Sequence, residues 1–554
     1  MRPAVVALAL VVVARPLAAQ PVGEVEVTVA RPQLPPVEHG YRTVRVALVS
    51  RSSRPREVTL SIPSFGYPRS GADLREVRRT VRLGPLERAS VTIPVPALAL
   101  MGSGLKVTAA GQETVLPLAI DNPSSVAARG GGPDDPDELV VLASRSVSGE
   151  ALEKGGHLLP TQVHRWEQPL AEWDTVWQAY SSYEGVFLTA ADLAGLPEAA
   201  RAALEQYAES GGTLVVLGET AAAPRVRYAG FGQVYTFTSS DPGALGAGTW
   251  IELRESFWRS YAPWRVRWNA ENAHQSFPVV NAIGIPVRGL FLLILVFAVA
   301  IGPLNLWAWA RAKRKLLLLV TVPALSIFTS VAVYLYALLS EGVARHARVE
   351  VLTLLEEGAH RATTFGLAAY YSALTPGGGL RFAPETELTL QGASTEGIPL
   401  SLDWTEGQHL SSGWMRARVP AYFQLRKSEL RRERVSFARE AGGLWAVNGL
   451  GADVDSLWYA DGEGKVWKGE NVAAGKRTLL EASGQRAEGN ERTLRDLYRG
   501  DWLGLTGRLL YGAPAALRPN CYLAVLRTTP FLEDALPRVG KRKGLSVVYG
   551  VRGG

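Results

Sequence analysis

Cysteine is almost missing from this sequence of 554 residues, in which Cys521 is the only example. One thiol cannot form an intramolecular disulfide or supply a Cys-x-x-Cys metal site. The seven histidines show no HxxH or HExxH spacing, and the chain contains no Gly-x-Ser-x-Gly elbow. These absences remove the usual signatures of a zinc site and of a serine hydrolase, so we expect no cofactor and no metal.

A concentrated charge of one sign is also missing. Lysine and arginine number 59 against 52 acidic residues, a net charge of +7 that is spread along the chain. No basic helix or stripe carries interleaved aromatics, so we do not expect a nucleic-acid partner. The chain is too long for one domain, and its 47% hydrophobic residues, with 15 tryptophans, are sufficient for several ordinary cores.

The first nineteen residues have the pattern of a secretory signal peptide. Arg2 gives a basic start, residues 4–14 are apolar, and the small residues Ala18 and Ala19 follow. Eleven helical residues rise only about 16 Å, roughly half of a hydrocarbon core. We therefore predict cleavage after Ala19 rather than a membrane span, with an uncleaved anchor as the alternative.

Two long apolar tracts, residues 289–310 and 316–340, are each long enough to cross a bilayer. The loop between them, residues 311–315, reads RAKRK. Short basic loops stay in the cytoplasm, so this one predicts a two-helix transmembrane hairpin whose ends both face outward. The signal peptide independently sends the N-terminal half outward.

Four residues of this hairpin are candidates for helix packing: Gly302, Pro303, Asn305 and Pro323. The prolines each remove a helical hydrogen bond, Gly302 permits a close approach, and Asn305 can hydrogen-bond to the other helix. A substrate path is the alternative interpretation. Neither tract has a charged residue in its interior, so packing is the preferred one.

Residues 20–123 predict an immunoglobulin-like β-sandwich. Apolar and polar residues alternate between turn-rich stretches in five segments: 24–29, 43–49, 57–62, 76–83 and 89–95. Residues 124–137 are rich in Gly, Pro and Asp and form a linker.

Residues 138–245 predict an α/β domain with a parallel sheet. Short apolar strands at 139–144, 185–189, 213–218 and 233–238 alternate with helical segments, of which 197–210 is the clearest. Pro197 lies at the first turn of that helix, and Gly211 and Gly212 follow its end. Residues 246–288 are a connector to the hairpin.

The segment SSYEGVFLTAADLAGLPEAARAALEQYAESGGTLVVLGE, residues 181–219, resembles a family of uncharacterised bacterial membrane proteins. Their α/β domain is similar to the class I glutamine amidotransferase fold, and the GPLN hairpin and the β-rich tail also resemble that group. Active members of the wider fold carry a cysteine nucleophile in an elbow after a core strand. Here Ala190, Ala191 and Asp192 follow the strand. The resemblance therefore implies the fold without amidotransferase activity.

Residues 341–554 predict a β-rich extracytoplasmic domain, with strands at 348–354 and 444–447 and a hairpin over 457–467. The arginine-rich stretch 426–439 also contains acidic residues, which favours a solvated face of mixed charge over contact with an anionic polymer or lipid. The basic segment 538–543 is so far from the hairpin in sequence that we do not interpret it as a lipid anchor.

Four residues form a candidate ligand site in the α/β domain: Thr189, Asp192, Gly218 and Glu219. They follow two core strands, and open α/β sheets bind ligands at the carboxyl ends of their strands. The alternative is that Asp192 only organises the turn before a helix.

The sequence thus predicts a non-catalytic scaffold or binding protein, anchored in the bacterial inner membrane with most of its mass in the periplasm. Its expected partners are the lipid bilayer and another envelope protein. Two alternatives stay open: an accessory subunit of an envelope transport or assembly complex, and an unrecognised hydrolase that uses Asp192 or another acid.

Overall fold

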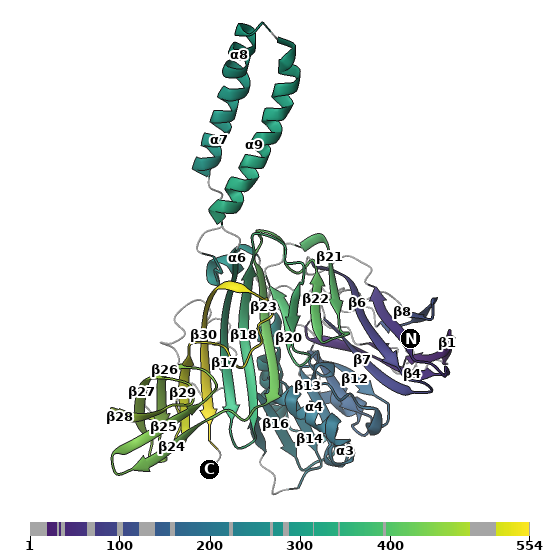
Figure 1. Cartoon of the computed structure of the whole chain (residues 1–554). Coiled ribbons are helices and arrows are strands. Elements are labelled where there is room, and N and C mark those ends of the chain that lie inside the picture. Colours follow the sequence, from purple (N-terminus) through teal and green to yellow (C-terminus); the bar gives the residue numbers. More distant parts are fainter. Residues whose placement is uncertain are drawn as a thin grey trace, which may run out of the picture.

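The computed structural model shows a β-rich body from which a helical hairpin projects (Figure 1). It describes residues 19–29, 33–34, 39–63, 72–96, 104–120, 139–155, 161–220, 225–265, 270–280, 287–313, 315–341, 344–391, 395–487 and 517–552. The predicted signal peptide, apart from its last residue, and the predicted linker lie outside these residues. The body is multidomain and contains mostly strands.

The N-terminal region contains two sheets around one apolar core, as the alternating sequence pattern predicts. The first sheet has the order β1-β2-β4-β7. The second contains β5, β6, β8 and β9, and a further pair joins β3 and β10. The strands are β1 (Gln20–Val22), β2 (Val25–Val29), β3 (Gln33–Leu34), β4 (Tyr41–Ser50), β5 (Arg56–Pro63), β6 (Ala72–Leu83), β7 (Arg88–Pro96), β8 (Gly104–Ala109), β9 (Gln112–Pro117) and β10 (Ala119–Ile120).

The second sheet continues into the C-terminal half of the chain. Strand β6 pairs in parallel with β21 (Thr395–Asp403), and β22 (Gln408–Ser412) and β19 (Leu380–Phe382) extend the sheet further. Next to this pairing, the Arg78 guanidinium lies 2.6 Å from the Asp403 carboxylate. Strands from before and after the hairpin therefore share one sheet.

The α/β domain has a sheet of order β12-β11-β13-β14-β16-β15, parallel except for the last strand. Helices α3 and α4 pack on one face of the sheet, and α5 packs on the other. Its elements are β11 (Leu139–Ser144), α2 (Gly149–Gly155), β12 (Thr161–Trp166), η2 (Leu170–Glu172), η3 (Trp177–Ala179), β13 (Gly185–Thr189), α3 (Ala190–Gly195), α4 (Glu198–Glu209), β14 (Thr213–Leu217), β15 (Val226–Ala229), β16 (Gly232–Phe237), η4 (Pro242–Ala244) and α5 (Ala247–Arg265). The next helix, α6 (Ala270–Ser276), packs instead with residues of the C-terminal half, such as Leu352 and Tyr422.

The C-terminal region is built on one sheet of eleven strands, ordered β20-β23-β18-β17-β30-β29-β26-β27-β28-β25-β24. Alternate side chains of β17 enter different apolar cores, Val349 and Val351 on one face and Leu352 and Leu354 on the other. The strands are β17 (Arg345–Glu356), β18 (Arg361–Tyr371), β20 (Glu387–Gln391), β23 (Ala421–Leu430), β24 (Arg434–Glu440), β25 (Gly443–Gly449), β26 (Val454–Ala460), β27 (Lys465–Val472), β28 (Arg477–Arg486), β29 (Cys521–Leu526) and β30 (Val539–Val551).

The hairpin consists of α7 (Val287–Val299), a π-helical turn η5 (Ala300–Leu304), α8 (Asn305–Arg311), η6 (Lys315–Leu317) and α9 (Leu318–Glu341). Two stretches, Phe291–Arg311 and Leu318–Tyr336, are long and apolar enough to cross a membrane. Their large apolar side chains are mostly exposed, in contrast to the core helices of a soluble body.

The candidate packing residues of the hairpin take different positions. Pro303 lies within the π-helical turn and Pro323 within α9. The Thr321 hydroxyl donates to Asn305 Oδ1 at 3.0 Å, so Asn305 does bond across the hairpin. A Cβ added at Gly302 would meet no atom within 4 Å, so Gly302 is not a point of close approach. That approach occurs at Gly289, where a Cβ would lie 1.8 Å from the Tyr336 hydroxyl oxygen.

Candidate functional site

The four residues of the candidate ligand site lie at one edge of the parallel sheet. Thr189 ends β13 and pairs with Leu217, the last residue of β14. Asp192 lies in the first turn of α3, and Gly218 and Glu219 follow β14. When the parallel strands are numbered along the chain, their order is 2-1-3-4-5, so the connections reverse direction between β11 and β13. Ligands of doubly wound sheets bind at this point.

At this reversal, the Asp192 carboxylate makes its hydrogen bonds within its own domain. It accepts hydrogen bonds from the hydroxyl of Ser144, the last residue of β11, at 2.6 Å and from the hydroxyl of Ser146, just beyond that strand, at 2.8 Å. It also accepts from the backbone N–H of Thr189, while its own N–H donates to the Thr189 hydroxyl. This reciprocal pair is a capping box, so Asp192 ties β11 to the start of α3.

The chemistry of Asp192 is that of a fixed anion. Burial favours its neutral form, but the hydrogen bonds from Ser144, Ser146 and Thr189 outweigh that effect and hold its pKa below the usual range. A general base works best with a pKa near the operating pH, which usually requires a raised carboxyl pKa. Asp192 has the opposite shift and already accepts three hydrogen bonds.

The other two residues do not converge on Asp192 through any contact that the structure records among its described residues. Gly218 adopts a φ of +74° and donates its N–H to the Ser239 carbonyl. The Glu219 carboxylate accepts from the N–H of Thr220, the next residue. The structure therefore brings Thr189 and Asp192 together and leaves Gly218 and Glu219 in a neighbouring turn.

A cluster that the sequence analysis missed lies where the α/β domain meets the large sheet. The Arg426 side chain, 3% exposed, lies 2.8 Å from the Glu387 carboxylate, which is fully buried. Its other N–H groups donate to the carbonyl oxygens of Ser181 and Ser210 in the α/β domain, both at 3.1 Å. Its guanidinium also lies 5.3 Å from the ring centroid of Trp177. One side chain of β23 thus contacts two segments of the α/β domain, residues 177–181 and Ser210.

A second contact beside it involves α4. The Glu209 carboxylate accepts a hydrogen bond from the Ser428 hydroxyl and lies 3.6 Å from the Arg361 guanidinium. Burial raises the pKa of Glu209, even though Ser428 and Arg361 favour its charged form. The α/β domain is therefore docked on the sheet through buried polar groups.

The N-terminal sandwich contacts the same side of the α/β domain. His39 lies 2.6 Å from the Glu184 carboxylate, both almost fully buried. The backbone N–H of Tyr41 donates to the Ser181 hydroxyl. The Tyr41 hydroxyl in turn accepts from the Leu388 N–H at 3.1 Å, which connects the sandwich to the large sheet. Three regions of the chain meet around these residues.

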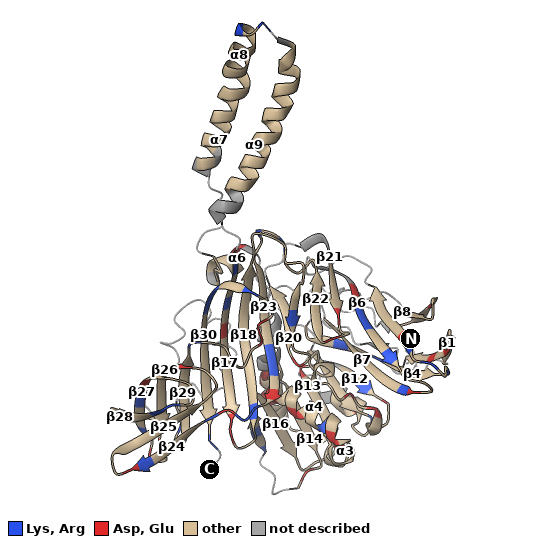
Figure 2. Cartoon of the chain, viewed as in Figure 1, with Lys and Arg blue, Asp and Glu red and all other residues tan. Residues whose placement is uncertain are grey.

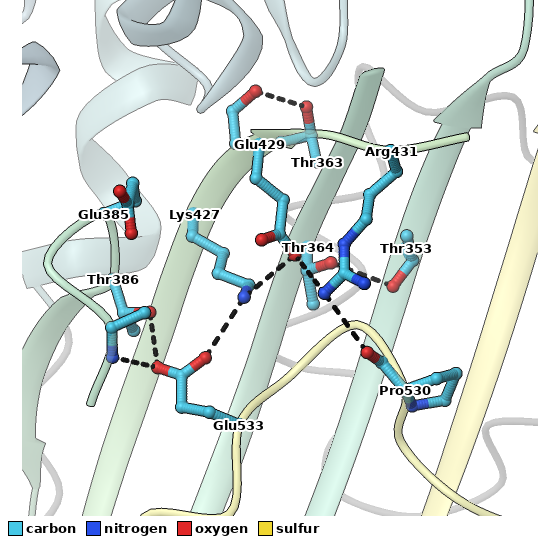
Figure 3. A network of polar contacts seen from close by, with 12 residues as sticks. Thr353, Thr363, Thr364, Glu385, Thr386, Lys427, Glu429, Arg431, Pro530 and Glu533 are labelled. Carbon is cyan, nitrogen blue, oxygen red and sulfur yellow. Dashed lines mark hydrogen bonds and ion pairs between the residues drawn. The ribbon is translucent and has the colours of Figure 1, made fainter. Parts of the chain in front are cut away.

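A third polar network lies on the opposite face of β23 (Figure 3). The Lys427 ammonium, on a side chain 3% exposed, lies 2.9 Å from Glu429 and 3.1 Å from Glu533. Glu533 also accepts hydrogen bonds from the Thr386 hydroxyl and the Ala383 N–H. Burial alone would raise the pKa of Glu533, but Lys427 and these donors lower it. The network joins the segment before β30 to the sheet through the ion pair between Lys427 and Glu533.

The Arg426 cluster and the Lys427 network correct the prediction of a solvated face over residues 426–439. Arg426, Lys427 and Ser428 are buried, and only the part of the stretch beyond β23 carries exposed charges. The signal that the sequence analysis missed is the distribution of polar residues along β23. They occur on both faces of the strand, and a different domain or loop covers each face.

The single cysteine is part of an apolar core. Cys521 begins β29 and packs with Leu517, Leu523 and Tyr549. Burial raises the pKa of its thiol, which disfavours the nucleophilic thiolate. Among the residues that the structure describes, no group of three or more His, Cys, Asp or Glu side chains is placed to hold a metal ion.

Comparison with known proteins adds little. No protein-family model matches the chain, and no curated protein matches it. Among solved structures, a β-glucosidase from Kluyveromyces marxianus in complex with glucose is 11% identical, with a TM-score of 0.08. The alignment covers 80% of this chain and 46% of that one. At this TM-score the similarity carries no argument about fold or function.

Proposed function

We propose that the chain is a membrane-anchored, extracytoplasmic scaffold or binding protein of the bacterial envelope. The observation that carries this proposal is the pairing of β6 with β21. Segments from before and after the hairpin can share a sheet only if both lie on the same side of the membrane. Two spans satisfy this condition, and the basic loop between them favours the cytoplasm for the loop. The body then faces the periplasm.

The proposal includes a non-catalytic α/β domain with a glutamine amidotransferase-like fold and an immunoglobulin-like N-terminal sandwich. Three observations support the lack of catalysis. Asp192 is held as an anion by its own domain, the only thiol lies in the core of the large sheet, and the buried charges of β23 are paired, Arg426 with Glu387 and Lys427 with Glu533. Their contacts hold the domains together, as expected for a scaffold.

Cysteine labelling in spheroplasts tests the topology. In a Cys521→Ser background, Ser53→Cys, Ala312→Cys and Ala473→Cys each place one thiol at an exposed position. We expect a membrane-impermeant maleimide to label the variants at 53 and 473 directly. The variant at 312, in the basic loop, should react only after permeabilisation. Labelling at 312 in sealed spheroplasts would refute the proposed orientation.

Substitution of Asp192 separates a structural role from a catalytic one. We expect Asp192→Ala to lower the free energy of unfolding by about 3 kcal/mol, because it removes a helix cap and leaves the buried Ser144 hydroxyl without its acceptor. Neither the wild type nor the variant should release ammonia from glutamine. Asp192→Asn, which keeps one acceptor oxygen, should recover part of the stability. Glutamine turnover by the wild type that is lost in a folded Asp192 variant would restore the enzyme class.

A further inference from the structure

The basic segment 538–543 lies close to the membrane hairpin in space, although it is far from the hairpin in sequence. Strand β30 pairs in parallel with β17, and its first residues align with the first residues of β17: Val539 with Arg345, Lys541 with His346 and Lys543 with Arg348. Strand β17 begins four residues after α9 ends. The basic segment therefore lies at the end of the sheet nearest the hairpin (Figure 2).

Chain geometry limits the distance of this end from the bilayer. The apolar span ends at Tyr336, and α9 continues to Glu341. Five helical residues rise about 7.5 Å, and four extended residues reach at most about 14 Å. Arg345 thus lies within roughly 21 Å of the edge of the hydrocarbon layer. The polar headgroup layer occupies about 5 to 7 Å of that distance.

The charges at this end are mostly positive. Residues 341–350 and 534–543 contain six lysines and arginines against three acidic residues. Asp534 pairs with Arg542, and Glu350 lies 2.7 Å from Arg348. Arg538, Lys541 and Lys543 are exposed. We call these three residues the juxtamembrane basic patch.

The neighbouring His346 is affected by the same positive charges. Burial lowers the pKa of His346, and the charges of Lys541 and Lys543 lower it further. Lys541 is the register partner of His346, so the positive charges of β30 lie next to β17. Such a surface attracts anions, and beside a bilayer the anions at highest density are lipid phosphates.

We propose that the juxtamembrane basic patch binds the headgroups of anionic phospholipids in the leaflet that faces the body. This proposal depends on the proposed membrane anchoring, because the hairpin fixes the patch beside that leaflet. Binding would limit tilting of the body relative to the hairpin, since the sheet would then contact the membrane at a second point. An anionic wall polymer is the competing ligand.

The test uses the full-length protein in nanodiscs of equimolar phosphatidylcholine and phosphatidylglycerol. Native mass spectrometry counts the lipids that stay bound. We expect Arg538→Gln/Lys541→Gln/Lys543→Gln to weaken phosphatidylglycerol binding at least about tenfold, since each cation near an anionic surface contributes roughly a fivefold effect. Retention of phosphatidylcholine should not change. The matched control is Arg434→Gln/Lys476→Gln/Arg486→Gln, which replaces three exposed cations. Arg434 lies on β24, Lys476 in the turn before β28, and Arg486 at the end of β28.

The outcomes separate this proposal from the proposed function. Equal phosphatidylglycerol retention by the wild type and the patch variant overturns lipid binding and leaves the anchoring intact. A wild type that does not enter nanodiscs overturns the anchoring itself. A patch variant that loses binding to an anionic wall polymer, with lipid retention unchanged, assigns the patch to the polymer and also overturns the proposal. Lipids bound at the basic loop of the other leaflet are a constant background in all variants.

Discussion

Replacing Arg426 with methionine is expected to destabilise the folded chain by about 3 to 5 kcal/mol, because the fully buried Glu387 carboxyl group would lose its ion-pair partner. The substitution also removes the donors to the carbonyls of Ser181 and Ser210. The α/β domain should therefore detach from the large sheet at a lower temperature than in the wild type. Thermal unfolding of the detergent-solubilised protein, combined with limited proteolysis, measures both effects.

The double variant Arg426→Met/Glu387→Met is the control for this experiment. Replacing both members of a buried ion pair with apolar residues of similar size is often close to neutral, whereas breaking the pair is not. We expect the double variant to recover most of the stability that the single variant loses. The single variant Glu387→Met completes the comparison. If the double variant loses as much stability as Arg426→Met and Glu387→Met lose together, Arg426 and Glu387 are not energetically coupled.

Replacing Gly40 with alanine is expected to disturb the contact between the sandwich and the α/β domain. Gly40 has a φ of +68°, and an added Cβ would lie 2.4 Å from the Ser181 carbonyl oxygen. That oxygen belongs to the backbone and cannot move aside without shifting the segment that Tyr41 and Arg426 bind. We expect a loss of about 2 to 4 kcal/mol, from the left-handed backbone and the overpacking together. Thermal unfolding measures this loss.

Gly111→Ala is the matched control for the backbone contribution. Gly111 also has a positive φ, +78°, but an added Cβ there meets nothing within 4 Å. Its substitution should cost only the left-handed conformation, about 1 to 2 kcal/mol. If the two variants lose the same stability, the contact with Ser181 contributes nothing.

Local sequence patterns were sufficient to predict many of the elements. The predicted strands 139–144 and 185–189 coincide with β11 and β13, and the predicted helix 197–210 differs from α4 by one residue at each end. The turn of the predicted 457–467 hairpin lies between β26 and β27. These features depend on periodicity and on turn residues, which a short window of sequence contains.

Pairing between distant strands was not predictable in this way. Nothing in residues 72–83 indicates that their neighbour is 395–403, because pairing depends on the packing of complete sheets. The same limit explains two errors about charge. Arg426 and Lys427 looked solvated because their covering segments are far away in sequence. Residues 538–543 looked remote from the hairpin because only the pairing of β30 with β17 brings them near it.

For the candidate ligand site, the sequence predicted that its residues lie at the carboxyl ends of β13 and β14, but not the contacts that they make. The position of Asp192 after a core strand is readable from the pattern. Its hydrogen bonds with Ser144 and Ser146 are not, since those serines belong to another part of the chain. Ser144 ends β11, the neighbour of β13, and Ser146 lies two residues beyond it; that placement is the one signal that could have suggested the contact.

The pairing of β6 with β21 also has a consequence for biogenesis. Arg78 and Asp403, which meet beside this pairing, are 325 residues apart, so β6 is synthesised long before its neighbour exists. At ordinary rates of translation the edge of β6 stays unpaired for tens of seconds. In the proposed topology, the hairpin is inserted and the second half is translocated during this time. Unpaired edges invite pairing with other chains. A chain truncated after the hairpin would keep this open edge permanently, so we expect it to aggregate or be degraded.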